Sequence, residues 1–98
     1  MYRSIILPLA KQDINEAAHW YGTKQKELGK RFTAQVSEKV KFILQNPAAT
    51  ALRYDGVRTV VLDVFPFMLH YSVDEDQKLV IISAVLHTSR NPGIWQER

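Results

Sequence analysis

The chain has 98 residues, of which 46% are apolar and 23% charged, with a net charge of +3 and no cysteine. This length and composition predict one soluble globular domain over residues 1–98, and the lack of cysteine excludes disulfides, thiol chemistry and cysteine-ligated metals. No apolar run approaches the ~20 residues of a membrane span, and the N-terminal apolar stretch is too short for a signal peptide, so we expect a cytoplasmic protein.

The first half of the chain predicts one strand and two helices. Residues 2–7 indicate a short strand that Pro8 ends. A helical period follows from Leu9, and Gly29 is the expected C-terminal stop. The apolar residues that share one face of this first helix are Ala10, Ile14, Ala17, Tyr21 and Leu28, with Trp20 beside them.

A second amphipathic helix follows after a short join. Its apolar residues recur at helical spacing, and they are Phe32, Val36, Val40 and Ile43. Asn46-Pro47 ends this helix, because proline cannot continue a helix and restricts the residue before it. Two helices with so short a join must pack antiparallel, as a helical hairpin.

The second half of the chain predicts an antiparallel meander. After a connector over residues 48–54, in which a strand could start at Leu52, and an Asp55-Gly56 turn, strands are expected at residues 57–65, 67–73 and 78–86. The last strand has a nearly continuous apolar run, which indicates burial on both faces and an internal place in the sheet. The fold class is therefore α+β: an N-terminal strand, a two-helix antiparallel hairpin and a three-stranded antiparallel meander, in a sheet of about four strands.

Polar side chains gather where the last strand ends, at His87, Ser89 and Arg90. A histidine can transfer a proton near neutral pH and an arginine can hold a phosphate through two hydrogen bonds, which would suit phosphodiester chemistry. The structural alternative is that His87 hydrogen-bonds carbonyl groups at the chain end and that Arg90 pairs with a surface carboxylate. Arg58 either joins this basic patch, or it is a solvated strand residue or a partner of Asp55 or Asp63.

Metal and cofactor sites are not expected. The three histidines lie on separate elements, without carboxylates at ligand spacing, and there is no glycine-rich phosphate loop. His70 and Tyr71 point to opposite faces of one strand, so only one of them can face a site, and Tyr71 is expected in the core or at its edge.

The chain resembles the RelE/ParE toxin superfamily of type II toxin–antitoxin modules. The segments that carry the resemblance are Ala10, Asp13, Ile14 and Tyr21 on the first helix, Asn46-Pro47, the run from Arg58 through Phe65-Pro66-Phe67 to Tyr71, and Val85-Leu86-His87-Thr88-Ser89-Arg90-Asn91-Pro92 with Trp95. The resemblance implies a cytoplasmic bacterial toxin that inhibits growth, as in plasmid stabilisation. It also implies a cognate antitoxin, encoded beside the toxin, that wraps a helix and an extended segment around it in a hetero-oligomer.

The resemblance implies two alternative mechanisms. ParE-like members bind and inhibit DNA gyrase and are not enzymes, whereas RelE-like members cleave mRNA on the ribosome. Thr88 stands where a His-Tyr ending would place a tyrosine, and the lysines fall mainly on the helices rather than the sheet, so the ParE-like branch is favoured. Under that interpretation Arg58, His87, Ser89, Arg90 and Trp95 bind the target; under the nuclease alternative Arg58, His87 and Arg90 are the catalytic candidates. Neither interpretation requires a cofactor or metal.

Overall fold

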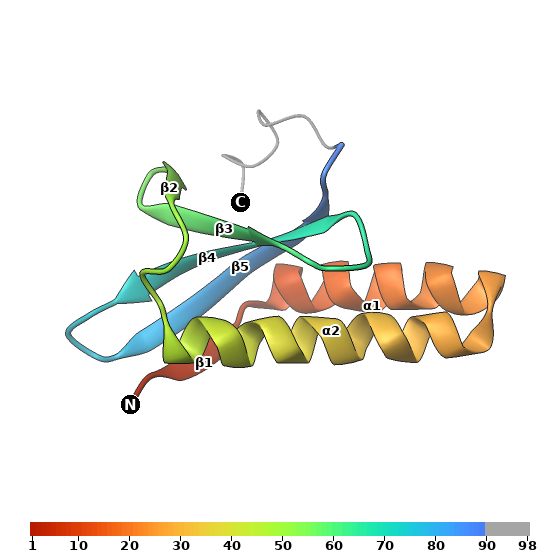
Figure 1. Cartoon of the computed structure of the whole chain (residues 1–98), viewed down its shortest axis with the longest axis horizontal. Helices are drawn as coiled ribbons and strands as arrows, with labels where there is room; N and C mark the ends of the chain where they lie inside the picture. Colours follow the sequence, from red (N-terminus) through yellow and green to blue (C-terminus); the bar gives the residue numbers. More distant parts are fainter. Residues whose placement is uncertain (90–98) are drawn as a thin grey trace.

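A helical hairpin covers one face of a five-stranded sheet in the computed structural model, which describes residues 1–89 (Figure 1). The elements are β1 (Arg3–Ile6), α1 (Pro8–Lys24), α2 (Lys26–Gln45), β2 (Leu52–Tyr54), β3 (Val57–Val61), β4 (Phe67–Asp74) and β5 (Leu79–His87). The strand order is β1-β5-β4-β3-β2. The α+β class, the antiparallel meander β3–β4–β5 and the internal position of β5 are confirmed. The sheet is nevertheless mixed, because β1 pairs parallel with β5, and the short β2 adds a fifth strand.

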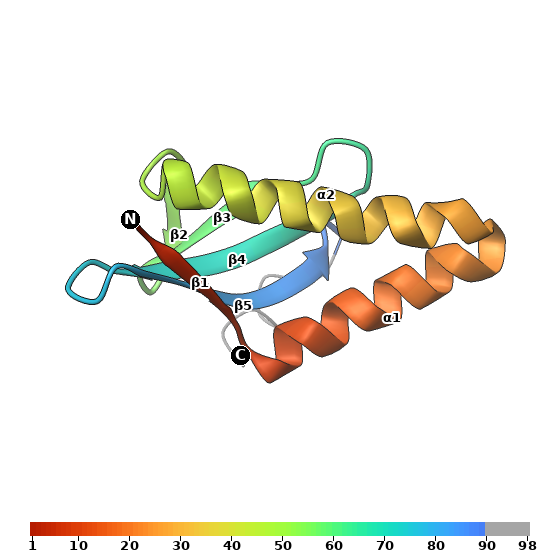
Figure 2. The ribbon, with the colours of Figure 1, turned by 90° about the horizontal axis from the view of Figure 1, so that it is seen from below.

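The hairpin turns earlier than its glycine predicted. Gln25 is extended (φ −159°, ψ 125°), which ends α1 at Lys24 and lets α2 start at Lys26. Gly29 therefore lies inside α2, and its predicted role as a helix stop is wrong. A Cβ atom at Gly29 would stand 2.7 Å from the Ala18 carbonyl oxygen, so this glycine permits the close approach of the two helices instead. Figure 2 shows the helices side by side, with their shared turn projecting past one end of the sheet. Within the described residues no helix is long and apolar enough to cross a membrane.

The core lies between the hairpin and the sheet. The apolar stripe of α2 is buried as predicted, and Phe32 packs edge-to-face on Phe65 and Phe67 with ring centroids 5.3 and 5.1 Å away. The strand predicted over residues 57–65 ends at Val61, and Phe65 turns into the core from the loop that follows. Lys39 of α2 holds this loop through an ion pair of 3.0 Å to Asp63.

A β-bulge at Ser83 decides which way the end of β5 faces. His70 pairs with Ala84 and Tyr71 with Ile82, so Ser83 is the extra residue between them. Ile82 packs in the core under the helices, whereas beyond the bulge it is Val85 that does so. Without the bulge, strict alternation would place His87 on the opposite face. The bulge thus turns His87 toward α1.

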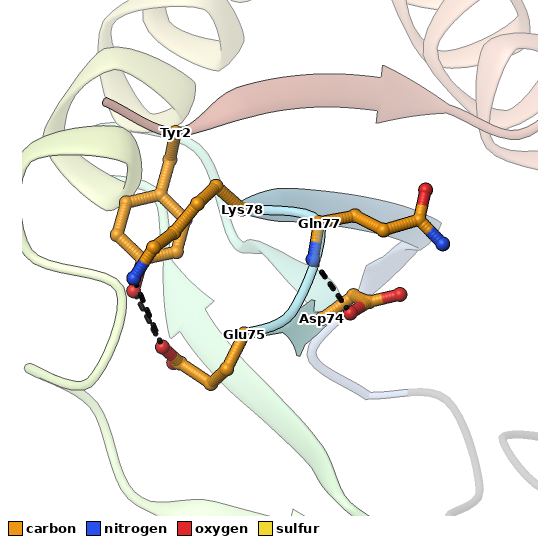
Figure 3. A network of polar contacts seen from close by, with 5 residues as sticks. All are labelled: Tyr2, Asp74, Glu75, Gln77 and Lys78. Carbon is orange, nitrogen blue, oxygen red and sulfur yellow. Dashed lines mark hydrogen bonds and ion pairs between the residues drawn. The ribbon is translucent and has the colours of Figure 1, made fainter.

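The β4–β5 turn is tied to the start of the chain (Figure 3). The Tyr2 hydroxyl donates a hydrogen bond of 2.7 Å to Glu75, and the Lys78 ammonium lies 4.0 Å from the same carboxylate and 5.2 Å from the Tyr2 ring centroid. Asp74 accepts the Gln77 backbone N–H at 3.1 Å. The neutral Tyr2 hydroxyl donates its hydrogen bond to Glu75, so Glu75 raises the pKa of Tyr2 above 10.0, with smaller contributions from burial and from the charge of Glu75.

Candidate functional site

A groove runs between α1 and the ends of β4 and β5, and we call it the α1 groove. It consists of two hollows of about 190 and 380 Å³ that share Ala17, Phe67 and His87. The other lining residues are Asp13, Glu16, Val85 and Leu86 in the smaller hollow and Trp20, Tyr21 and Pro66 in the larger. The larger hollow is mainly apolar, whereas two carboxylates line the smaller one. The α1 groove is therefore apolar at its centre and acidic at one end.

The wall of the α1 groove is fixed by a contact between Asp13 and β5. The pairing of β1 with β5 reaches only Ile82, so the edge of β5 beyond this point has no strand beside it. There the Asp13 carboxylate accepts the backbone N–H of Val85 at 3.0 Å. This contact satisfies a buried donor and holds α1 on the sheet. The sequence signal for this contact was the position of Asp13 between Ala10 and Ala17, the two buried residues of α1.

The structure brings His87 and Ser89 together. The Ser89 backbone N–H donates to His87 Nδ1 at 3.1 Å, and the Ser89 hydroxyl lies 2.8 Å from the same nitrogen. A backbone N–H can only donate, so Nδ1 is an acceptor and the neutral ring carries its proton on Nε2. The ring also packs edge-on against Phe67, with centroids 5.2 Å apart. The neutral ring of His87 therefore offers a hydrogen-bond donor rather than a base at Nε2.

Arg58 lies at the other end of the sheet. It pairs across the strands with Tyr71, whereas His87 pairs with Phe67. Tyr71 and Phe67 are separated by about 13 Å along β4 at the usual rise per strand residue. The structure therefore does not bring Arg58 and His87 into one basic patch, and the alternative partner Asp63 is paired with Lys39 instead.

Arg58 belongs to a second polar cluster, the connector clamp, which consists of Pro47, Thr50, Arg58 and Tyr71. The Arg58 guanidinium donates to the Thr50 carbonyl oxygen, and the buried Tyr71 hydroxyl donates to the Pro47 carbonyl oxygen at 3.0 Å. The Thr50 hydroxyl lies 2.7 Å from the Tyr71 hydroxyl. These contacts attach the segment after α2 to the sheet. The prediction that Tyr71 lies in the core is confirmed.

Sequence reasoning missed two residues of the α1 groove and named Arg58, which lies at the other end of the sheet. Trp20, which the sequence placed beside the apolar face of the first helix, is 55% exposed and lines the larger hollow. Glu16 was not singled out, although it stands four residues before Trp20 on the same helix face. Arg90 and Trp95 lie outside the described residues. Tyr21, on the groove wall, stays neutral well into the alkaline range, because burial raises its pKa above 10.0.

The described residues contain no cluster of three or more histidine or carboxylate side chains that could hold a metal ion. The chemical groups of the α1 groove are an imidazole, a phenol and two carboxylates around an apolar floor. Such a surface is suited to recognising a polypeptide, because apolar area and a few fixed polar groups provide affinity and orientation.

Comparisons with known proteins relate this arrangement to toxins. The family described as "ParE toxin of type II toxin-antitoxin system, parDE" matches residues 5–92. Among solved structures, the chromosomal ParDE TA system from P. aeruginosa has a TM-score of 0.77 at 22% identity, covering 89% of this chain and 96% of that chain. The intact E. coli RelBE toxin-antitoxin complex has a TM-score of 0.69 at 19% identity, covering 92% and 100%. The isolated E. coli RelE toxin has a TM-score of 0.68 at 18% identity, covering 99% and 95%. No curated protein gives a significant match. At these identities the structural likenesses show a common fold.

Proposed function

Because the chain belongs to the ParE toxin family of type II toxin–antitoxin systems, we propose that it binds and inhibits DNA gyrase and that it does not cleave RNA. In this proposal it acts in the cytoplasm, and a cognate antitoxin binds it and suppresses its toxicity. The fold is common to ParDE and RelBE systems, so the choice of target rests on the residues of the site.

The separation of Arg58 from His87 is the main support for gyrase, rather than RNA, as the proposed target. A nuclease site needs its proton-transfer group and its phosphate-binding cation within reach of one phosphodiester. Here the guanidinium of Arg58 binds the Thr50 carbonyl in the connector clamp, while His87 stands at the other end of β4.

The surroundings of His87 support the same preference. The described side chains that share its hollows include Asp13 and Glu16, whose negative charge repels a phosphate backbone. Its Nδ1 accepts from Ser89, so the neutral ring has no free lone pair with which to take a proton from a ribose hydroxyl. Binding through the C-terminal region is the alternative to acid–base chemistry, and Arg90 and Trp95 are the anchors that we propose for it, since Arg and Trp are frequent hot-spot residues.

Parallel assays of DNA supercoiling and mRNA integrity after brief induction test the target. We expect loss of gyrase supercoiling activity with intact mRNA, and the same inhibition in a purified supercoiling reaction. Codon-specific mRNA cleavage on translating ribosomes, with gyrase unaffected, would assign the nuclease mechanism instead.

Substitutions at the end of the chain test the mode of action. At matched protein levels, His87→Gln should leave growth arrest largely intact, since glutamine cannot act as a general acid or base but preserves much of the size and polarity. Arg90→Ala and Trp95→Ala should weaken growth arrest more strongly, because each removes a proposed binding anchor. If His87 were a general acid or base, His87→Gln would lower the rate about 10²–10⁴-fold. A folded His87→Gln protein without toxicity therefore contradicts the binding mechanism.

A further inference from the structure

The positive charge of the chain is concentrated at the turn of the helical hairpin. We call residues 24–31 the hairpin tip, and its cations are Lys24, Lys26, Lys30 and Arg31. With one carboxylate, Glu27, the tip has a net charge of +3. The rest of the chain holds nine cationic and nine acidic side chains, so the whole net charge of the protein lies in these eight residues. An anion that approaches the protein is therefore attracted most strongly to the hairpin tip.

The cations of the hairpin tip are available to a partner. All four are exposed, and none forms an ion pair with a carboxylate of residues 1–89, in which the paired lysines are Lys39 and Lys78. The turn between α1 and α2 projects past one end of the sheet (Figure 2). The tip can therefore contact a large partner before the sheet does.

Stability of the hairpin does not account for this charge arrangement. Lys26 is the first residue of α2, where the helix dipole disfavours a cation. Lys26 and Lys30 are four residues apart on the same helix, a spacing at which like charges repel. Glu27, in the first turn of α2, offsets only part of this repulsion. A bound polyanion would relieve both costs.

The composition of the hairpin tip favours nucleic acid over a polypeptide. Leu28 is the apolar side chain of the tip, and it packs against the core. The tip therefore lacks an exposed apolar anchor of the kind on which protein–protein interfaces depend. Protein–DNA interfaces are more polar and much more positively charged, which is the character of the tip.

The surroundings of Trp20 favour a duplex over a single strand. Proteins that bind single strands stack the bases on exposed aromatic rings. Trp20, one turn before Lys24, is 55% exposed, but the Lys24 ammonium lies over its ring at 5.1 Å from the centroid. The Tyr21 ring contacts Trp20 edge to face, with centroids 5.0 Å apart. The hairpin tip is therefore suited to phosphate groups rather than to bases.

We propose that the hairpin tip binds the phosphate backbone of duplex DNA without recognising its sequence. The lysines and the arginine neutralise phosphates and release counterions, which provides the affinity. A consequence, which rests on the proposed function, is that the tip holds the toxin at the DNA on which gyrase acts. Removal of the tip cations should then weaken gyrase inhibition.

The test measures binding of the purified full chain to a labelled duplex of about 30 base pairs by fluorescence anisotropy at several salt concentrations. We expect a Kd of about 10⁻⁶–10⁻⁴ M at physiological salt, as for other sequence-independent binding. The logarithm of the binding constant should fall with the logarithm of salt concentration with a slope of about −3, as expected for three to four phosphate contacts. A second duplex of unrelated sequence should bind within about twofold of the first.

Two double variants with the same net charge locate the contact. Lys26→Gln with Lys30→Gln should weaken DNA binding about 10-fold or more at about 0.1 M salt and reduce the salt slope by about 2. Lys11→Gln with Lys41→Gln removes two exposed lysines of the same helices, away from the tip. This control should bind DNA within about twofold of wild type and retain the slope. Circular dichroism and thermal unfolding establish that both variants are folded.

Several outcomes would overturn the assignment. Equal losses in the two double variants would mean that DNA responds to the overall charge and not to the hairpin tip. Tighter binding to a single strand, to duplex RNA or to polyglutamate of equal charge would replace duplex DNA as the ligand. Absence of binding even at about 50 mM salt would exclude a phosphate site at the tip.

A purified gyrase supercoiling reaction separates this inference from the proposed function. The Lys26→Gln, Lys30→Gln variant should require a higher concentration than wild type for the same inhibition, whereas the control variant should not. Unchanged inhibition in the tip variant would overturn the role of the tip at gyrase and leave the proposed function in place. A wild-type chain that binds DNA through the tip but does not inhibit gyrase would contradict the proposed function and leave the DNA site in place.

Discussion

The two ends of β4 use similar residue types for opposite purposes. At one end, the connector clamp joins an arginine, a tyrosine and a threonine to each other and to backbone carbonyls of the segment after α2. At the other end, His87 and Tyr21 line a hollow that no described segment fills. The first end stabilises the fold, and the second leaves a surface for a partner. A cationic or aromatic residue on a strand therefore indicates a binding site only where no other group of the same chain already contacts it.

The difference between these two ends arises from the chain path. The segment that leaves α2 crosses the sheet beside Tyr71, so its carbonyls meet the polar groups there. At the other end β1 stops at Ile6, and the helical hairpin projects past the sheet (Figure 2). Asp13 satisfies the backbone at that point but does not fill the space around His87.

Truncating one aromatic residue at each end of β4 should show the largest difference in the free energy of unfolding. Tyr71→Ala removes a fully buried side chain and should lower the free energy of unfolding by about 3–5 kcal/mol, as for other aromatic truncations in a core. Trp20→Ala, at the half-exposed wall of the α1 groove, should cost less than about 1 kcal/mol. Urea or guanidinium unfolding measures both values. Similar losses of unfolding free energy in Tyr71→Ala and Trp20→Ala would show that Trp20 is as much a part of the core as Tyr71.

A smaller effect tests how the wall of the α1 groove is held. Asp13→Ala leaves the buried Val85 N–H without its acceptor and should cost about 1–3 kcal/mol. Asp13→Asn retains an oxygen that can accept this hydrogen bond and should cost less. Unfolding curves and hydrogen exchange of the Val85 amide follow the two variants. Equal losses in Asp13→Ala and Asp13→Asn would mean that the hydrogen bond does not hold α1 on β5.

The smallest expected effect is a change of stability at alkaline pH that depends on Tyr2 and Glu75. These residues lie near the connector clamp, since Glu75 lines the same hollow as Arg58. The pKa of Tyr2 is raised in the folded chain, chiefly because its neutral hydroxyl donates to Glu75. The resulting stabilisation is fully present below the unfolded pKa of 10.0 and is lost as pH rises through the higher folded pKa.

Tyr2→Phe removes this hydrogen bond while retaining the ring beside Lys78. The stability difference between wild type and Tyr2→Phe should therefore be small, constant near neutral pH, and should decline above about pH 10. Unfolding curves of both chains between about pH 8 and pH 12 provide the comparison, in which the two chains differ only at Tyr2. A difference that grows with pH would assign the opposite sign to the Tyr2 shift.

Periodic apolar residues made the helices and strands predictable. The stripe at Phe32, Val36, Val40 and Ile43 sufficed for α2, and the apolar run in β5 sufficed for its internal place, because burial on one or both faces leaves a pattern in the sequence. The family resemblance likewise followed from the order of elements and from the motifs along them, and the family match bears it out. Candidate residues at the end of β5 could be named from their position after the last strand.

The sequence by itself therefore determined the α+β class, the hairpin, the meander and the position of His87 and Ser89 at the end of β5. The tertiary structure alone decided which residues meet. A single extra residue at Ser83 reverses the side-chain alternation, and nothing in an apolar run marks where that residue falls. Gly29 could equally have ended a helix or allowed two helices to approach, and only the position of Ala18 distinguishes these roles. Arg58 is likewise separated from His87 by strand register, which depends on contacts between residues far apart in the sequence.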